Sequence, residues 1–235
     1  MVQITGELGD PPERVLDLWR LDELRGIARR SRHLSDPGRP DDLHGDPPVR
    51  RGVREHLPAL AEAAATIGAA QIQNRGTIGG NIANASPAGD TLPVLLAADA
   101  SIVLGSGRGE RQVAAAEFWT SYRVTVRAPD ELILGVRLPL APRRSVRFRK
   151  VGTRRAQAIS KVVMALAYRE DAGVWRDVRV ALGSVAATPI RVPRTERSWR
   201  ERRLATRPPT MPRLPSRRRS RPSMTCARPR STVVQ

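Results

Sequence analysis

Apolar residues along the chain follow two periodicities, and each predicts a different kind of element. Helical spacing occurs over 57–67, and two further apolar stretches predict helices at 92–97 and 159–168. Alternating or short continuous apolar runs bounded by turn residues predict strands at 15–18, 100–104, 131–139, 147–151 and 178–185. Because these helices and strands do not alternate as regular βαβ units, the pattern favours an α+β fold.

Two stretches interrupt the periodicity. Residues 31–52 hold four Pro and three Gly and no aromatic residue, which is typical of a loop or a disordered segment. Residues 197–235 hold six Pro and 12 Arg without an apolar pattern, and we expect that this tail does not fold by itself. Regular structure is therefore expected over 1–30 and 53–196.

Charge is distributed unevenly along the chain. The 41 basic and 23 acidic residues give a formal net charge of +18, which suggests an anionic partner such as nucleic acid. The tail 197–235 has 12 Arg and one acidic residue, so it carries +11 of this net charge. Of the 41 basic residues in the whole chain, 39 are Arg, which indicates GC-rich coding. A basic nucleic-acid-binding protein stays open as an alternative, although Trp199 is the only aromatic residue among the arginines of the tail.

Composition excludes several other classes. A single cysteine, Cys226, excludes an internal disulfide framework, a multi-cysteine zinc site and an iron–sulfur cluster carried by this chain. No apolar run approaches the roughly 18 residues that a membrane span needs. The N-terminus lacks the charged and then apolar pattern of an export signal. We therefore expect a cytoplasmic protein without a membrane partner.

The segment 71–90 carries the clearest chemistry. It has three glycines that permit close backbone approach, which suits amides that bind a phosphate: Gly76, Gly79 and Gly80. Neutral hydrogen-bonding side chains accompany them: Thr77, Asn81 and Ser86. Asp90 could accept a hydrogen bond from a ribose hydroxyl. The alternative is a tight glycine turn with asparagine caps, and the segment is not a P-loop because no Gly-Lys-Ser/Thr follows.

The run Gly-Thr-Ile-Gly-Gly-Asn-Ile-Ala-Asn-Ala-Ser-Pro-Ala-Gly-Asp at 76–90 resembles the flavin-binding signature of the molybdenum hydroxylase family. This family includes the FAD subunits or domains of xanthine dehydrogenase and its relatives. The resemblance continues downstream in 118–123, 130–133 and 148–162, in the family's order, and covers about 1–30 and 53–196.

The resemblance implies a two-lobed FAD-binding domain of the PCMH type over 1–140. It also implies that a smaller α+β domain begins over 146–196, similar to the C-terminal domain of the carbon monoxide dehydrogenase flavoprotein. FAD would be held non-covalently. The residues that match the loop around the FAD pyrophosphate are Thr77, Ile78, Gly79, Gly80 and Asn81. Three more match FAD contacts: the carboxylate Asp90, the apolar Ile133 and the basic Lys150. Two alternatives stay open, namely that Ile133 is an ordinary core residue and that Lys150 is a solvated charge. No catalytic or metal-binding residue is expected in this chain.

The resemblance also implies an electron-transfer role. In the family, FAD accepts electrons from a 2Fe–2S small subunit and passes them to NAD⁺ or another acceptor, while a molybdopterin-binding large subunit oxidises the substrate. The run Asn-Ile-Ala-Asn-Ala-Ser-Pro at 81–87 favours the xanthine dehydrogenase branch over the carbon monoxide dehydrogenase type. A second alternative to this function, besides nucleic-acid binding, is a decayed scaffold that no longer holds flavin.

Two departures from the family pattern lead to a hypothesis about the gene. The family's first FAD loop, an Ala-Gly-Gly-Thr-Asp-Leu run, would precede the residues that match 1–3. We therefore expect either that an internal Met has been taken as the start or that the chain is truncated at that end. Residues 39–45 and 224–233, back-translated and read in a shifted frame, can encode strings that resemble family motifs. We therefore expect that 31–52 and 197–235 are frame-shifted, which reading the nucleotide sequence would test.

Overall fold

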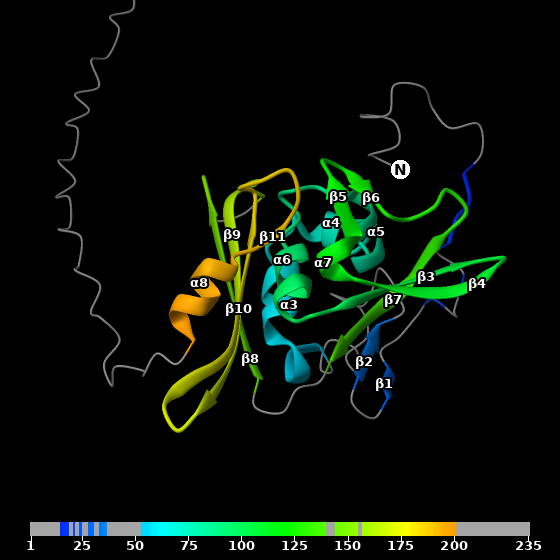
Figure 1. Ribbon diagram of the computed structural model, residues 1–235. Coiled ribbons are helices and arrows are strands. Elements are labelled where there is room, and N and C mark those ends of the chain that lie inside the picture. The colour runs from blue at the N-terminus through cyan, green and yellow to red at the C-terminus, as the bar shows by residue number, and fades with distance from the viewer. Residues whose placement is uncertain are drawn as a thin grey trace, which may run out of the picture. The chain divides into compact units, whose positions relative to one another are not determined.

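The computed structural model describes residues 15–18, 21, 24, 28–30, 33–36, 53–139, 144–154 and 157–200 (Figure 1). Its helices are α3 (Pro58–Ala64), α4 (Ala70–Gln73), α5 (Ile78–Asn84), α6 (Leu92–Ala97), α7 (Ala115–Phe118) and α8 (Pro193–Trp199). Its strands are β1 (Ala28–Arg30), β2 (His33–Asp36), β3 (Ser101–Ser106), β4 (Gly109–Ala114), β5 (Trp119–Ser121), β6 (Val124–Thr125), β7 (Leu132–Pro139), β8 (Arg144–Gly152), β9 (Ser160–Asp171), β10 (Val174–Gly183) and β11 (Ile190–Arg191).

The strands form two larger antiparallel sheets and a short hairpin. The first sheet has the order β1-β2-β7-β3-β4, and the second has the order β11-β10-β9-β8. The hairpin pairs β5 with β6. Helices α3 to α6 come before the central strands of the first sheet in sequence, and α8 follows the second sheet. This arrangement of segregated helices and antiparallel strands confirms the α+β fold class.

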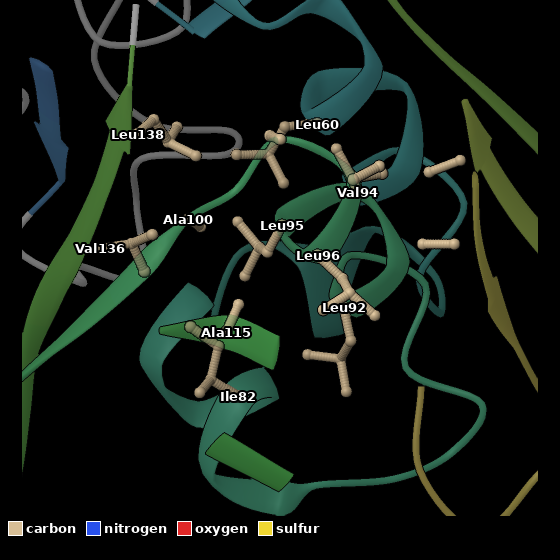
Figure 2. Close-up of a cluster of buried hydrophobic side chains, with 14 of the residues drawn as sticks. Leu60, Ile82, Leu92, Val94, Leu95, Leu96, Ala100, Ala115, Val136 and Leu138 are labelled. Carbon is tan, nitrogen blue, oxygen red and sulfur yellow. The ribbon is translucent and has the colours of Figure 1, made fainter. Parts of the chain in front are cut away.

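Helix α6 lies at the centre of the core. Every residue of Leu92–Ala97 is buried, as expected for a helix that is apolar on all sides. It packs against β9 and β10, and its side chains join one hydrophobic cluster with residues of β3 and β7. Figure 1 shows α3 and α6 between the two larger sheets, and Figure 2 shows Leu95 of α6 among Val136, Leu138 and Ala115.

The opposite face of the second sheet has a smaller cluster of its own. Leu166, Val178 and Val180 form its buried part. Tyr168 stacks on Trp175 with ring centroids 4.6 Å apart, and Trp199 of α8 meets Trp175 edge-on at 6.2 Å. The second sheet is therefore covered on one face by α3 and α6 and on the other by α8 (Figure 1).

The structure confirms most of the predicted elements and corrects some. The helices at 57–67 and 92–97 and the strands at 100–104, 131–139, 147–151 and 178–185 are present as α3, α6, β3, β7, β8 and β10. The predicted helix at 159–168 is wrong, because these residues belong to β9. The predicted strand at 15–18 is also wrong, since this segment has no regular secondary structure.

Two segments without apolar periodicity contain regular structure. His33–Asp36, within 31–52, forms β2 and pairs with β7, so this part is not a loop. Helix α8 runs to Trp199, past the start of the predicted tail. The rest of 31–52 and of 197–235 lies almost entirely outside the described residues. The frame-shift hypothesis for these segments therefore stays a prediction, and so do the domain boundaries. Within the described parts of the chain, no helix is long and apolar enough to cross a membrane.

Candidate functional site

The predicted phosphate-binding loop folds as the turn that begins helix α5. Thr77 is the N-cap, and its Oγ1 accepts a hydrogen bond from the amide of Gly80 at 2.6 Å. The side chains of Ile78 and Ile82 are buried and anchor the helix to the core, whereas Gly80 is exposed. Since the first amides of a helix have no carbonyl partner within it, the amides of Ile78 and Gly79 are donors at the free end of α5.

Two side-chain hydrogen bonds and a left-handed C-cap define the position of α5 behind this turn. Thr91 Oγ1 donates to Asn81 Oδ1 at 2.5 Å, which orients the Asn81 amide group. The indole Nε1 of Trp119 donates to the carbonyl of Ile82 at 3.2 Å. The helix ends at Ala85, whose φ of 49° is the left-handed conformation common at helix C-termini. The turn is therefore held by the core and by two side chains from distant segments.

Asp90 and Lys150 meet in a buried ion pair. Lys150 Nζ lies 2.5 Å from Asp90 Oδ2 and donates to the carbonyl of Thr66 at 3.0 Å. Lys150 is therefore not a solvated charge, because its side chain is only 13% exposed and is paired with a carboxylate. Lys150 comes from β8 in the second sheet, whereas Asp90 follows α5, so the pair joins two parts of the molecule far apart in sequence.

Two further residues, neither of them predicted from the sequence as site residues, contact the Asp90 carboxylate through their hydroxyl groups. Ser160 Oγ donates to Asp90 Oδ1 at 2.5 Å, and Thr66 Oγ1 lies 3.1 Å from Asp90 Oδ2. Thr66 is the residue whose carbonyl Lys150 also contacts. No short motif includes these residues together, because Ser160 is 70 positions away from Asp90 in the chain.

Ile133 is partly buried against the main hydrophobic cluster. It lies on β7, where it pairs with Leu104 of β3, and α5 packs against the same strand. The position suits a core residue, and its role as a flavin contact stays a prediction. The structure thus brings the turn 77–81 and the Asp90–Lys150 pair together through Thr91, which follows Asp90 and holds Asn81.

A second ion pair stabilises the loop that leads into β7. The Arg111 guanidinium donates two hydrogen bonds to the Glu131 carboxylate, at 2.6 and 2.8 Å. The amide of Ala128 donates a third at 2.7 Å. These donors favour the ionised form and lower the pKa of Glu131 to about 2, with the Arg111 hydrogen bonds as the main cause.

Comparisons with known proteins match both halves of the described structure. Residues 45–141 match the model of the FAD binding domain in molybdopterin dehydrogenase, and residues 147–208 match that of the CO dehydrogenase flavoprotein C-terminal domain. The glyceraldehyde dehydrogenase medium chain of Sulfolobus acidocaldarius is 32% identical over 190 residues, 80% of this chain and 66% of the relative. The xanthine dehydrogenase FAD-binding subunit of Escherichia coli O157:H7 is 33% identical over 195 residues, 80% of this chain and 65% of the relative.

The chain belongs to the family of FAD-binding medium subunits of molybdenum hydroxylases. A solved structure of carbon monoxide dehydrogenase from Hydrogenophaga pseudoflava, which lacks the Mo-pyranopterin moiety of its cofactor, is similar in fold. It matches with a TM-score of 0.79 at 28% identity, over 87% of this chain and 70% of the matched chain. This medium-subunit chain thus spans about two thirds of the length of the curated relatives named above.

The residues of this medium-subunit chain fit the FAD of its family. The start of α5 offers backbone amides beside the side-chain-free Gly79 and Gly80, which is the donor set that a pyrophosphate needs. A Cβ added at Gly80 would lie 2.8 Å from Thr77 Oγ1, so the N-cap requires glycine there. Within the part of the chain that the structure describes, no group of three or more His, Cys, Asp or Glu residues could hold a metal ion.

Proposed function

We propose that the chain binds FAD at the start of α5 and serves as the electron-transfer subunit of a molybdenum hydroxylase. The observation that carries this proposal is the Thr77-capped Gly79–Gly80 turn, whose free amides are linked through Asn81 and Thr91 to the buried Asp90–Lys150 pair. Bound FAD would supply a carrier that takes up and releases electrons. The chain itself binds and orients this carrier.

Each part of the site has a role in this proposal. The amides of Ile78 and Gly79 donate to the pyrophosphate, and Asn81 holds the turn against Thr91. Asp90 accepts a hydrogen bond from a hydroxyl of the cofactor, and Lys150 holds that carboxylate in place. Ile133 packs on the flavin side of the site.

The partners follow from the same family. We propose that a 2Fe–2S small subunit delivers electrons to the flavin, that a molybdopterin-binding large subunit oxidises the substrate, and that NAD⁺ or another acceptor receives the electrons. Relatives named for xanthine and for carbon monoxide match at 33 and 32% identity, so overall similarity does not separate the xanthine dehydrogenase branch from the carbon monoxide dehydrogenase type. A cytoplasmic location is part of this proposal. The genes beside this one are expected to encode the two partner subunits.

Titration of the full chain with FAD tests the proposed function. The wild-type apoprotein is expected to bind FAD and to shift the flavin absorbance band. Gly80→Val is expected to weaken FAD binding at least about tenfold, or about 1.4 kcal/mol, because a branched side chain blocks approach to the turn. Gly107→Val, at an open position in the β3–β4 hairpin, is the matched control and should bind like the wild type.

Two further results would separate the alternatives. Thr77→Ala removes the cap without adding bulk, so a much smaller loss of FAD affinity than for Gly80→Val is expected if the turn binds the cofactor directly. Wild-type protein that binds no FAD but retards DNA at low salt would contradict the proposal and support nucleic-acid binding.

A further inference from the structure

The start of strand β9 is turned toward Asp90 by a break in the strand pairing. Lys150 pairs with Val163 across the second sheet, and both side chains face the helices. Regular alternation would bring Lys161 to the same face as Val163. The register shifts between Val151 and Gly152, and Gly152 pairs with Ser160. Consequently Ser160 is buried and Lys161 is exposed.

The side chain that this irregularity buries contacts the candidate FAD site. Ser160 is 5% exposed, and its hydroxyl donates to Asp90 Oδ1 at 2.5 Å. Lys150 and Thr66 contact the other oxygen, Oδ2. Among the described residues, Ser160 is the only one that donates a hydrogen bond to Asp90 Oδ1. Since a carboxylate oxygen has two lone pairs, one acceptor position of Oδ1 is left beside this hydrogen bond.

The same contacts connect the second sheet to the phosphate-binding turn. Ser160 holds Asp90, the next residue is Thr91, and Thr91 Oγ1 donates to Asn81 Oδ1 in α5. A rotation of the Asp90 carboxylate would therefore displace Oδ1, the proposed acceptor for the cofactor hydroxyl. The same rotation would disturb the phosphate-binding turn through Thr91.

We propose that Ser160 is a positioning residue for FAD, which acts by fixing the orientation of the Asp90 carboxylate; this inference rests on the proposed function. The hydroxyl of Ser160 occupies one acceptor position of Oδ1, and the other position would accept the hydrogen bond from a cofactor hydroxyl. The second domain thus contributes to cofactor binding through a residue that need not touch FAD. A threonine at this position keeps the hydroxyl, whereas an alanine loses it.

A double-mutant cycle on the full chain tests this role, with the dissociation constant for FAD as the readout. Ser160→Ala is expected to weaken FAD binding about tenfold, and Ser160→Thr is expected to stay within about twofold of the wild type. In an Asp90→Asn background, Ser160→Ala should cause less than about a twofold further loss, because its effect passes through the carboxylate. Ser145→Ala, on β8 of the same sheet and paired with Tyr168, is the control.

The outcomes distinguish this inference from the proposed function. Wild-type affinity in Ser160→Ala, or an equal loss in both backgrounds, would overturn the positioning role while the flavin function stands. A wild-type protein that binds no FAD would overturn both. Urea unfolding of each variant separates folding from binding. If Ser160→Ala fails to fold, Ser160→Cys replaces the hydroxyl with a slightly larger thiol that is only a weak donor, and a wild-type affinity in that variant would equally overturn the role.

Discussion

Thr77 closes the first turn of α5 with its own side chain, so its contribution to stability can be separated from ligand binding. The hydrogen bond from the Gly80 amide to Thr77 Oγ1 satisfies one of the helix's free donors. Thr77→Ala is expected to lower the free energy of unfolding by about 1 kcal/mol, and Thr77→Ser by only a few tenths. Urea denaturation measures both, and equal stability of Thr77→Ala and the wild type would contradict the cap.

The ionisation of Glu131 makes the free energy of unfolding depend on pH in the acidic range. Its pKa is lowered to about 2 by Arg111 and the Ala128 amide, whereas an ordinary glutamate titrates near 4.5. The ionised carboxylate therefore stabilises the fold above about pH 4.5, and this contribution is lost as the pH falls toward 2. The difference in unfolding free energy between the wild type and Glu131→Gln is expected to be largest at neutral pH and to shrink over that range.

Urea denaturation at pH 7, 4 and 3 measures this difference. Glu110→Gln is the matched control, because Glu110 is exposed on β4 and should show no comparable trend. A constant difference between wild type and Glu131→Gln at all three values would show that the ionised pair with Arg111 is not the cause.

At the residue scale, the sequence predicted the local part of the candidate site and missed the part made by tertiary contacts. The turn 77–81 is contiguous and rich in glycine, so its pattern is visible in the chain. Asp90 and Lys150 were predicted from the family resemblance, and the structure brings them together. Ser160 and Thr66 carry no local signal, because one depends on a strand irregularity and the other on the end of α3.

Strand β9 shows why element type was harder to predict than element position. Ala165 and Ala167 face the helices, whereas Met164 and Leu166 face the side of α8. A strand that is covered on both faces reads as a continuous apolar run, and such a run does not distinguish a strand from a buried helix. Helix α6 has a similar run, and its prediction as a helix was confirmed.

Glu196 attaches α8 to the second sheet. Its Oε1 accepts from the Val180 amide at 3.0 Å, and both of its oxygens accept from Arg191. Burial disfavours the charged form, but the hydrogen bonds from Arg191 and Val180 outweigh it and lower the pKa of Glu196. The carboxylate therefore stays ionised, and its hold on α8 is present above the ordinary pKa of glutamate and lost in acid.

Removing this carboxylate should release α8 before the sheet. Glu196→Ala leaves the buried amide of Val180 without its acceptor, with an expected cost of about 1–3 kcal/mol at neutral pH. Trp199 of α8 contacts Trp175, so near-ultraviolet circular dichroism should weaken in this variant. Arg197→Ala, at an exposed position on the same helix, is the control. An unchanged tryptophan signal in Glu196→Ala would show that other contacts hold the helix.

At the scale of the whole molecule, the two sheets share one core. Residues of β3 and β7 belong to the same cluster as Val146, Ala165 and Ala181 of the second sheet, with α6 between them. Ser184 also donates its amide to the carbonyl of Pro87 at 2.8 Å. The segments that match two separate family models are thus expected to unfold together rather than one after the other.

Hydrogen exchange followed by mass spectrometry tests this cooperativity within one molecule. The most protected amides of β3 and β9 are expected to open with free energies equal to within about 0.5 kcal/mol. Leu95→Ala, which removes a fully buried side chain from α6, should lower both values together by about 2–5 kcal/mol. Val185→Ala, at an exposed position, should lower neither. Because Leu95 lies in the cluster that both sheets share (Figure 2), a loss of protection confined to β3 or to β9 would show that the halves are separate folding units.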